Sequence, residues 1–260
     1  GSRAGHLARR EQCQSIDSES RMNWFRQVWA VFSKDLLVER RSPARISGLF
    51  FFALALLLLV AYANGGSSFL LPQIAGATLW VGLLLASTRA LDQSWAIELE
   101  RGALEGLVLW PVSPSALFYG KALANTVVLL IVLAVLCPLT LAIYDVYVTG
   151  SIQLFVGILL LGCSAIAAPG TLYGAITARA RGSSVLLPLL LFPLIVPALI
   201  AAAKGCSALF GDDAILLEQA SGWFNILRLF NILNYTSGSR VACQIRRIFR
   251  DAPGRPAVVG

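Results

Sequence analysis

Apolar runs of about 20 residues alternate with short polar stretches along most of this chain, and an α-helix needs that length to cross the hydrocarbon core of a bilayer. Because backbone polar groups must be satisfied internally in lipid, helices are the expected spanning elements. We therefore predict an all-α fold, a polytopic transmembrane helical bundle with five clear spans and a doubtful sixth. The five clear spans are residues 46–63, 69–88, 122–143, 152–177 and 184–203.

Two segments precede the first span. Residues 1–21 are polar and lack the apolar region of a signal peptide, and because Met22 is the only methionine we expect the natural start there. Residues 22–45 combine apolar side chains at helical spacing with basic ones, which predicts either an interfacial helix or a cytosolic helix packed on its own bundle. The remaining units are the transmembrane domain over 46–204, its cytoplasmic segment over 89–121 and a divergent C-terminal segment over 205–260.

Composition and charge agree with a membrane protein. Hydrophobic residues make up 57% of the chain and charged residues 13%, whereas a soluble domain has about half and about a quarter. The net charge of +7 could indicate nucleic-acid binding, but the basic residues flank the apolar runs on one side, as the positive-inside rule requires. We expect a lipid bilayer, no nucleic-acid partner, and a cytoplasmic N-terminus; Lys204, on the other side, can snorkel.

Several function classes lack the residues they need. The interiors of the five spans contain no Asp, Glu, His or Arg, which weakens the case for a secondary transporter or an intramembrane enzyme. The stretch "SALFYGKA" has Ser115 where a phosphate-binding loop needs glycine and Ala122 where it needs a hydroxyl. No ATPase or other enzyme is expected in this chain. The scattered cysteines and single histidine predict no metal site, and Cys137 and Cys163 are expected to be small buried hydrophobes.

The cytoplasmic segment is amphipathic where it follows the second span. One stripe is polar (Glu98, Arg101, Glu105) and its neighbour is apolar (Ile97, Leu104, Val108). Pro111 and Pro114 would then end any helix. The spacing predicts a short amphipathic helix on the cytoplasmic face; on spacing alone, a solvated loop on the headgroups is the favoured alternative.

Three motifs carry a resemblance to a known family: "KDLLVERRS" at 34–42, "ELERGALEGLVLWPVSP" at 98–114 and "GKALAN" at 120–125. In this order, on a background of hydrophobic spans, they resemble the CcmB family, the membrane subunit of the ABC-type complex of bacterial cytochrome c maturation. The resemblance covers about residues 23–203.

The resemblance implies a six-span permease subunit of the bacterial inner membrane. Its implied partners are a cytoplasmic ABC ATPase subunit, a haem-handling membrane subunit, a small membrane subunit and a periplasmic haem chaperone. ATP would act through the partner subunit, and hydrolysis would release the haem-loaded chaperone or deliver haem. Because no histidine lies in the spans to ligate haem iron, we expect a mechanical role with no cofactor bound directly. The alternative is a stand-alone membrane channel or secondary carrier.

By analogy with other ABC permeases, the resemblance implies that the amphipathic helix docks in a groove of the ATPase. The residues expected to couple the two subunits are Glu98, Glu100, Arg101, Leu104, Glu105, Leu107 and Val108. A second set could contact a partner or anchor the topology: Glu39, Arg40, Arg41, Gly120 and Lys121. Asn125, just inside the third span, could hydrogen-bond across helices.

Residues 214–235 stand where the family has its sixth span, and two effects oppose one another there. Arg228 near the middle costs about 3 kcal/mol on the insertion scale, and Glu218 and several asparagines add to this. Five arginines in the tail would instead place it in the cytoplasm: Arg240, Arg246, Arg247, Arg250 and Arg255. We predict that the segment lies along the outer interface by side chains such as Trp223, Phe224, Leu229 and Phe230. The tail would then be periplasmic and the subunit impaired in assembly.

Overall fold

The computed structural model describes the chain as a bundle of α-helices. The residues that it describes are 23–40, 43–64, 71–100, 113–177, 186–210 and 214–251. Residues 23–40 form one helix, here called the N-terminal helix. The others are α2 (Pro43–Ala63), α3 (Leu71–Glu100), α5 (Pro114–Ile143), α6 (Ile152–Thr177), α7 (Leu186–Leu209) and α8 (Ala214–Asp251).

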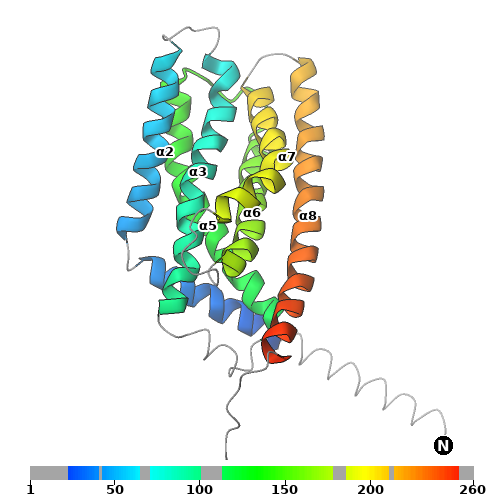
Figure 1. Ribbon diagram of the computed structural model, residues 1–260. Coiled ribbons are helices and arrows are strands. Elements are labelled where there is room, and N and C mark those ends of the chain that lie inside the picture. Colours follow the sequence, from blue (N-terminus) through cyan, green and yellow to red (C-terminus); the bar gives the residue numbers. More distant parts are fainter. Residues whose placement is uncertain are drawn as a thin grey trace, which may run out of the picture.

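The long helices lie side by side, and the N-terminal helix lies across one end of them (Figure 1). We call that end, with the start of α5 and the C-terminal part of α8, the proximal end. The opposite, distal end holds the turn between α5 and α6. There the amide of Thr149 donates to the carbonyl of Leu209, 3.0 Å away, which joins that turn to the end of α7.

The all-helical prediction is confirmed, and three of the five clear spans are confirmed by length and composition. The helical stretches that suffice to cross a membrane are Pro114–Ile143, Ile152–Ala175 and Leu191–Leu209. The apolar stretches Ser47–Ala63 and Gln73–Thr88 are shorter, so the first two spans stay predictions.

Several helix boundaries differ from the sequence prediction. α7 continues to Leu209 rather than ending at residue 203. α5 begins at Pro114 rather than residue 122, because Ser113 caps it: its hydroxyl accepts from the Ala116 amide, and proline follows at the first helical position. α3 continues past residue 88 to Glu100 without a break. The start of the predicted coupling segment is therefore a direct extension of the second apolar helix.

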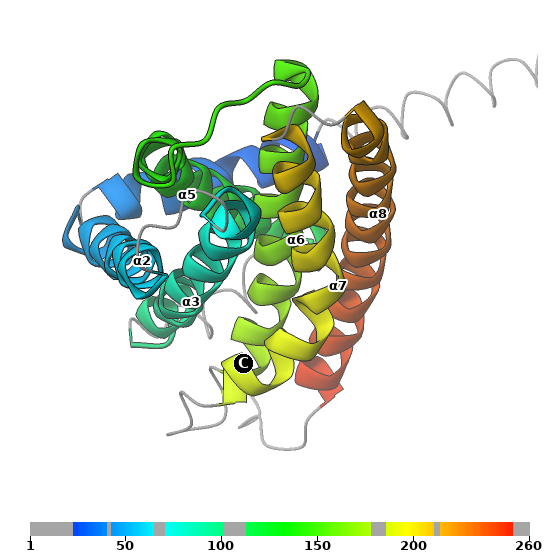
Figure 2. The ribbon, with the colours of Figure 1, turned by 90° about the horizontal axis from the view of Figure 1, so that it is seen from above.

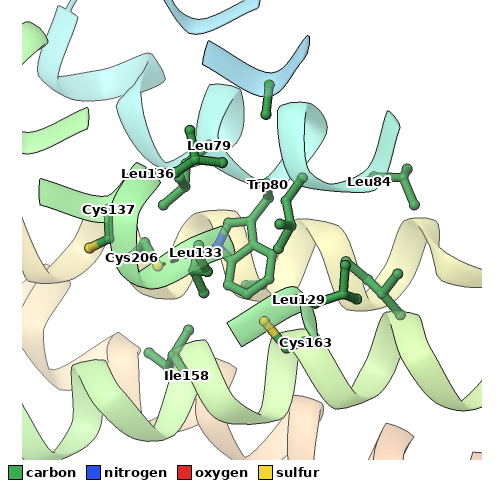
Figure 3. Close-up of a cluster of buried hydrophobic side chains, with 14 of the residues drawn as sticks. Leu79, Trp80, Leu84, Leu129, Leu133, Leu136, Cys137, Ile158, Cys163 and Cys206 are labelled. Atoms are coloured by element: carbon green, nitrogen blue, oxygen red, sulfur yellow. Dashed lines mark hydrogen bonds between the residues drawn. The ribbon is translucent and has the colours of Figure 1, made fainter. Parts of the chain in front are cut away.

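Glycines let the helices approach closely in the middle of the bundle. A Cβ on Gly76 would lie 2.8 Å from the carbonyl oxygen of Ala203, so α3 and α7 pack backbone to backbone there. Gly162 of α6 makes room for the ring of Trp80, which is fully buried. Figure 3 shows Trp80 among leucines and three cysteines, with its indole Nε1 donating to Cys206 Sγ at 3.3 Å.

The expectations for buried small and polar residues in the spans are confirmed. Cys137 and Cys163 are buried and not disulfide-bonded. Asn125 donates from Nδ2 to Thr171 Oγ1 at 2.9 Å, which joins α5 to α6 as predicted. Near the distal end the Tyr144 hydroxyl donates to the carbonyl of Leu57, 3.0 Å away. Burial raises the pKa of this phenol.

The structure does not lay residues 214–235 flat across one end of the bundle. By length and composition α8 is not among the helices that suffice to cross a membrane, so its crossing stays a prediction. α8 runs lengthwise beside α6 and α7 (Figures 1 and 2), and its C-terminal part reaches the proximal end. Trp223, Phe224 and Phe230 pack against the core instead of lying in an interface. The insertion scale treats every residue as facing lipid, whereas Asn231 faces hydrogen-bond partners on α6 and apolar rings pack on the core.

Asn231 shows how α8 accommodates a polar residue inside the bundle. Its Nδ2 lies 2.9 Å from the carbonyls of Leu161 and Leu227, and its Oδ1 accepts from Ser164 Oγ at 2.6 Å. Three hydrogen bonds therefore satisfy a side chain that is 6% exposed.

Replacing Asn231 with leucine is expected to loosen α8 from α6, because the two interhelical hydrogen bonds, to the Ser164 hydroxyl and to the Leu161 carbonyl, are lost. The loss is about 1 kcal/mol, typical of a hydrogen bond between membrane helices. Thermal unfolding in detergent measures it. The control is Asn234→Leu, since Asn234 donates only to the Phe230 carbonyl of its own helix among the described contacts; equal losses for both variants would contradict an interhelical role.

Candidate coupling site at the proximal end

The N-terminal helix is bound to Ser113, which lies within the predicted cytoplasmic segment over 89–121. Gln27 Oε1 accepts from both the amide of Ser113, 3.0 Å away, and its hydroxyl, 3.1 Å away. Trp24 Nε1 donates to Ser115 Oγ at 3.1 Å. Ser113 also caps α5, so one residue joins the coupling segment, α5 and the N-terminal helix.

A buried ion pair forms the second attachment. Lys121 Nζ lies 3.2 Å from Asp35 Oδ2, and the lysine side chain is 1% exposed. Asp35, 15% exposed, also lies 3.2 Å from the more exposed Lys34. A buried ammonium group needs such a partner, because its desolvation is otherwise uncompensated.

Gly120 lets the N-terminal helix and α5 approach closely where they cross. A Cβ there would lie 2.7 Å from Val31 Cβ and 3.0 Å from the carbonyl oxygen of Val28. Real Cβ atoms essentially never approach another heavy atom within 3.0 Å. Only glycine therefore lets the N-terminal helix lie directly on α5 at this crossing.

Aromatic rings extend the junction to α8. Trp24 meets Tyr119 edge-on at 5.5 Å between centroids, and Tyr119 stacks on Tyr235 at 5.7 Å. The Tyr119 hydroxyl donates to the Tyr235 carbonyl at 3.4 Å. Phe118 lies 6.2 Å from Tyr235 and fits against Gly238, where a Cβ would clash with its ring. The N-terminal helix, α5 and α8 are thus joined at the proximal end.

The family model described as "CcmB protein" matches residues 26–237. The chain belongs to the CcmB family. The match extends beyond the expected limit near residue 203 and includes most of α8, so this helix is part of what the chain shares with other CcmB proteins. The resemblance inferred from the three motifs is confirmed.

The CcmB relatives carry the name "Heme exporter protein B". The chain is 35% identical over 176 residues to the one from Rhodobacter capsulatus, covering 67% of this chain and 80% of the relative. It is 34% identical to the Paracoccus denitrificans protein, covering 65% of this chain and 79% of the relative. The Escherichia coli protein is 33% identical over 100 residues, or 38% of this chain and 46% of that protein.

The residues predicted from the CcmB motifs meet different outcomes. The structure brings Gly120 and Lys121 into the junction, where they pack inward. Glu39 is buried at 7% exposure and Arg40 is exposed, while Arg41 lies outside the described residues.

The predicted coupling residues of this CcmB chain stay predictions. Glu98 and Glu100 lie in the last turn of α3, and their side chains are outside the described part. The other five lie wholly outside it: Arg101, Leu104, Glu105, Leu107 and Val108.

The prediction missed Gln27, Asp35 and Ser113. Two signals point to Asp35 and Ser113: a single aspartate within a basic helix, which needs a cation, and a serine before proline, which is a helix cap. No sequence signal points to Gln27.

Proposed function

We propose that this chain is the permease subunit of an ABC-type complex in bacterial cytochrome c biogenesis. It would couple ATP hydrolysis by a partner subunit to haem delivery or to release of the haem-loaded chaperone. The names of the relatives and the CcmB membership support the haem-related role. The observation that supports coupling is the pair of hydrogen bonds that Ser113 donates to Gln27 Oε1.

The cytoplasmic segment over 89–121 is attached to the bundle at two places. Its first residues continue α3, and Ser113 within it is held by the N-terminal helix and caps α5. A push on the segment by an ATPase would reach both helices, because packed helices move as rigid bodies rather than deform. The aromatic contacts would carry the same movement to α8.

The orientation that we propose puts the proximal end in the cytoplasm of a bacterial inner-membrane protein. Arg26, Lys34, Arg40 and Arg240 lie on the elements of this end, in agreement with the positive-inside rule. α8 then supplies the sixth span. The N-terminal helix exposes Phe25, Trp29 and Leu37 at 64%, 68% and 57%. These side chains suit the headgroup level, so the N-terminal helix would pack on the bundle with one side and lie in the interface with the other.

The complex, rather than this chain, would hold the nucleotide and the haem. The sequence lacks a complete phosphate-binding loop, and its one histidine, His6, precedes the predicted start. A cytoplasmic ABC ATPase, haem-handling and small membrane subunits, and a periplasmic haem chaperone are the partners we propose. A stand-alone channel or carrier is the competing function.

Reversing the charge of Glu98 and Glu105 tests the docking role. Lysine at both positions would oppose the basic groove that we propose on the ATPase, and opposed like charges cost several kcal/mol. We expect the E98K/E105K double variant to insert normally, to lose the ATPase during purification, and to lose cytochrome c assembly in a host lacking its own CcmB protein. Gln153→Lys, at an exposed distal position, is the control. Wild-type retention of the ATPase and of assembly by E98K/E105K would rule the docking role out.

A further inference from the structure

The outer side of α8 carries a polar stripe that the bundle does not use. Its members are Glu218, Ser221, Asn225 and Arg228, all exposed. Their spacing of three, four and three residues puts them along one face of the helix, the spacing of a seam between two helices. Gly222 lies beside the stripe, and a Cβ there would meet nothing within 4 Å. Figure 2 shows α8 at the edge of the bundle, with α6 and α7 on one side only.

Arg228 lies well inside the apolar zone. It precedes Tyr235, whose ring stacks at the proximal end, by seven residues, or about 10 Å along the helix. The first residue of α8 is about 21 Å away in the other direction. Helical side chains lean toward the N-terminus of their helix, which for α8 is the distal end. The guanidinium therefore leans away from the nearer end of the bundle.

The surroundings of Arg228 on this chain are apolar. Leu229 and Ile232 beside it are 59% and 51% exposed. Among the described residues it forms no ion pair. An arginine at membrane depth is costly when it faces lipid, and such residues normally pair with an opposite charge.

We propose that the polar stripe of α8 binds a transmembrane helix of a different subunit, one that carries a carboxylate at the depth of Arg228. This inference rests on the proposed function, which places the chain in a complex with other membrane subunits. Asn225 and Ser221 would hydrogen-bond along the same seam, and Gly222 would let the two backbones approach.

A second copy of this chain does not supply the carboxylate. α2, α5, α6 and α7 contain no Asp or Glu. Glu218 lies about 15 Å along α8 from Arg228. Asp92 follows Leu91, which packs on Gly170, and Leu161 is level with Asn231 of α8. Asp92 therefore lies about 13 Å nearer the proximal end than Asn231, and farther still from the level of Arg228. Two copies about an axis normal to the membrane present equal depths to each other, so Arg228 would face Arg228.

A photo-crosslinking amino acid at Ile232 tests the proposal in the full chain in native membranes. The expected product is one adduct with a different polypeptide, attached to an apolar helix that contains Asp or Glu. The same amino acid at Ile131, exposed on α5, is the control and should not give this adduct. A product of two copies of the chain, or only lipid adducts, would overturn the proposal.

Variants of Arg228 then test the charge. We expect Arg228→Leu to lower the yield of the adduct at least tenfold and Arg228→Lys to keep most of it. Arg228→Glu should regain the adduct when the carboxylate of the identified helix is changed to arginine. Thermal unfolding of the purified variants shows that the bundle itself is intact. Equal yields for Arg228→Leu and wild type would overturn the ion pair.

The ATPase separates this proposal from the proposed function. If it co-purifies with the chain while no adduct forms, the helix docking alone is wrong. If neither occurs, the proposed function is wrong as well.

Discussion

Gly120→Val is expected to detach the N-terminal helix from α5 and to abolish cytochrome c assembly without preventing membrane insertion. The new Cβ would fall 2.7 Å from Val31 Cβ and 3.0 Å from the carbonyl oxygen of Val28. Neither neighbour is the flexible end of a long side chain, so the helix itself must move. Overpacking of this kind costs about 3 kcal/mol, the upper part of its usual range.

Protease access to the N-terminal helix in membrane vesicles measures the detachment, and complementation of a host lacking CcmB measures the function. Gly48→Val is the matched control, because a Cβ at Gly48 would meet nothing within 4 Å. If Gly120→Val were as protected and as active as Gly48→Val, the close crossing would have no role in coupling.

Lys121→Met is expected to destabilise the same junction by removing the cation of its buried ion pair. It leaves Asp35, 15% exposed, with Lys34 as its remaining ion-pair partner among the described residues. Breaking a buried pair on one side costs 3 to 5 kcal/mol, and since Asp35 keeps some solvent we expect about 3 kcal/mol. Replacing both charges in the D35N/K121M double variant should restore most of the stability, because no uncompensated charge is then buried.

The buried thiols of Cys137, Cys163 and Cys206 offer the measurement. They react with a maleimide dye when the bundle opens on heating, so the reaction temperature reports unfolding. Lys34→Met is the control, since the Lys34 side chain is 50% exposed and an exposed pair contributes little. Equal unfolding temperatures for Lys121→Met and Lys34→Met would show that the buried pair does not hold the junction.

Hydropathy predicted the helices of this protein well because a bilayer demands long, uniformly apolar segments. It failed where a boundary depends on something other than hydropathy. The start of α5 is fixed by the cap at Ser113 and by Pro114, which lie eight residues before the apolar run begins. α8 was misplaced because summed insertion costs ignore which side of a helix each residue occupies. Asn231, for example, faces hydrogen-bond partners on α6 rather than lipid.

The sequence was enough to locate the candidate site, but it did not predict the contacts that the site residues make. The family motifs singled out Gly120 and Lys121, yet their partners Val31 and Asp35 lie more than 80 residues earlier in the chain. No local spacing relates residues so far apart. The motifs therefore pointed to a partner or anchoring role, whereas the structure buries both residues in a contact within the chain.

The most direct test of the account is whether this chain carries an ATP-hydrolysing subunit with it. The tagged full chain is purified in mild detergent from membranes in which it supports cytochrome c assembly, and ATP hydrolysis in the eluate is measured. The account predicts a stoichiometric ATPase subunit that is retained with the wild type and lost with the E98K/E105K double variant. A chain that supports assembly and yet purifies without any ATP-hydrolysing subunit would contradict it.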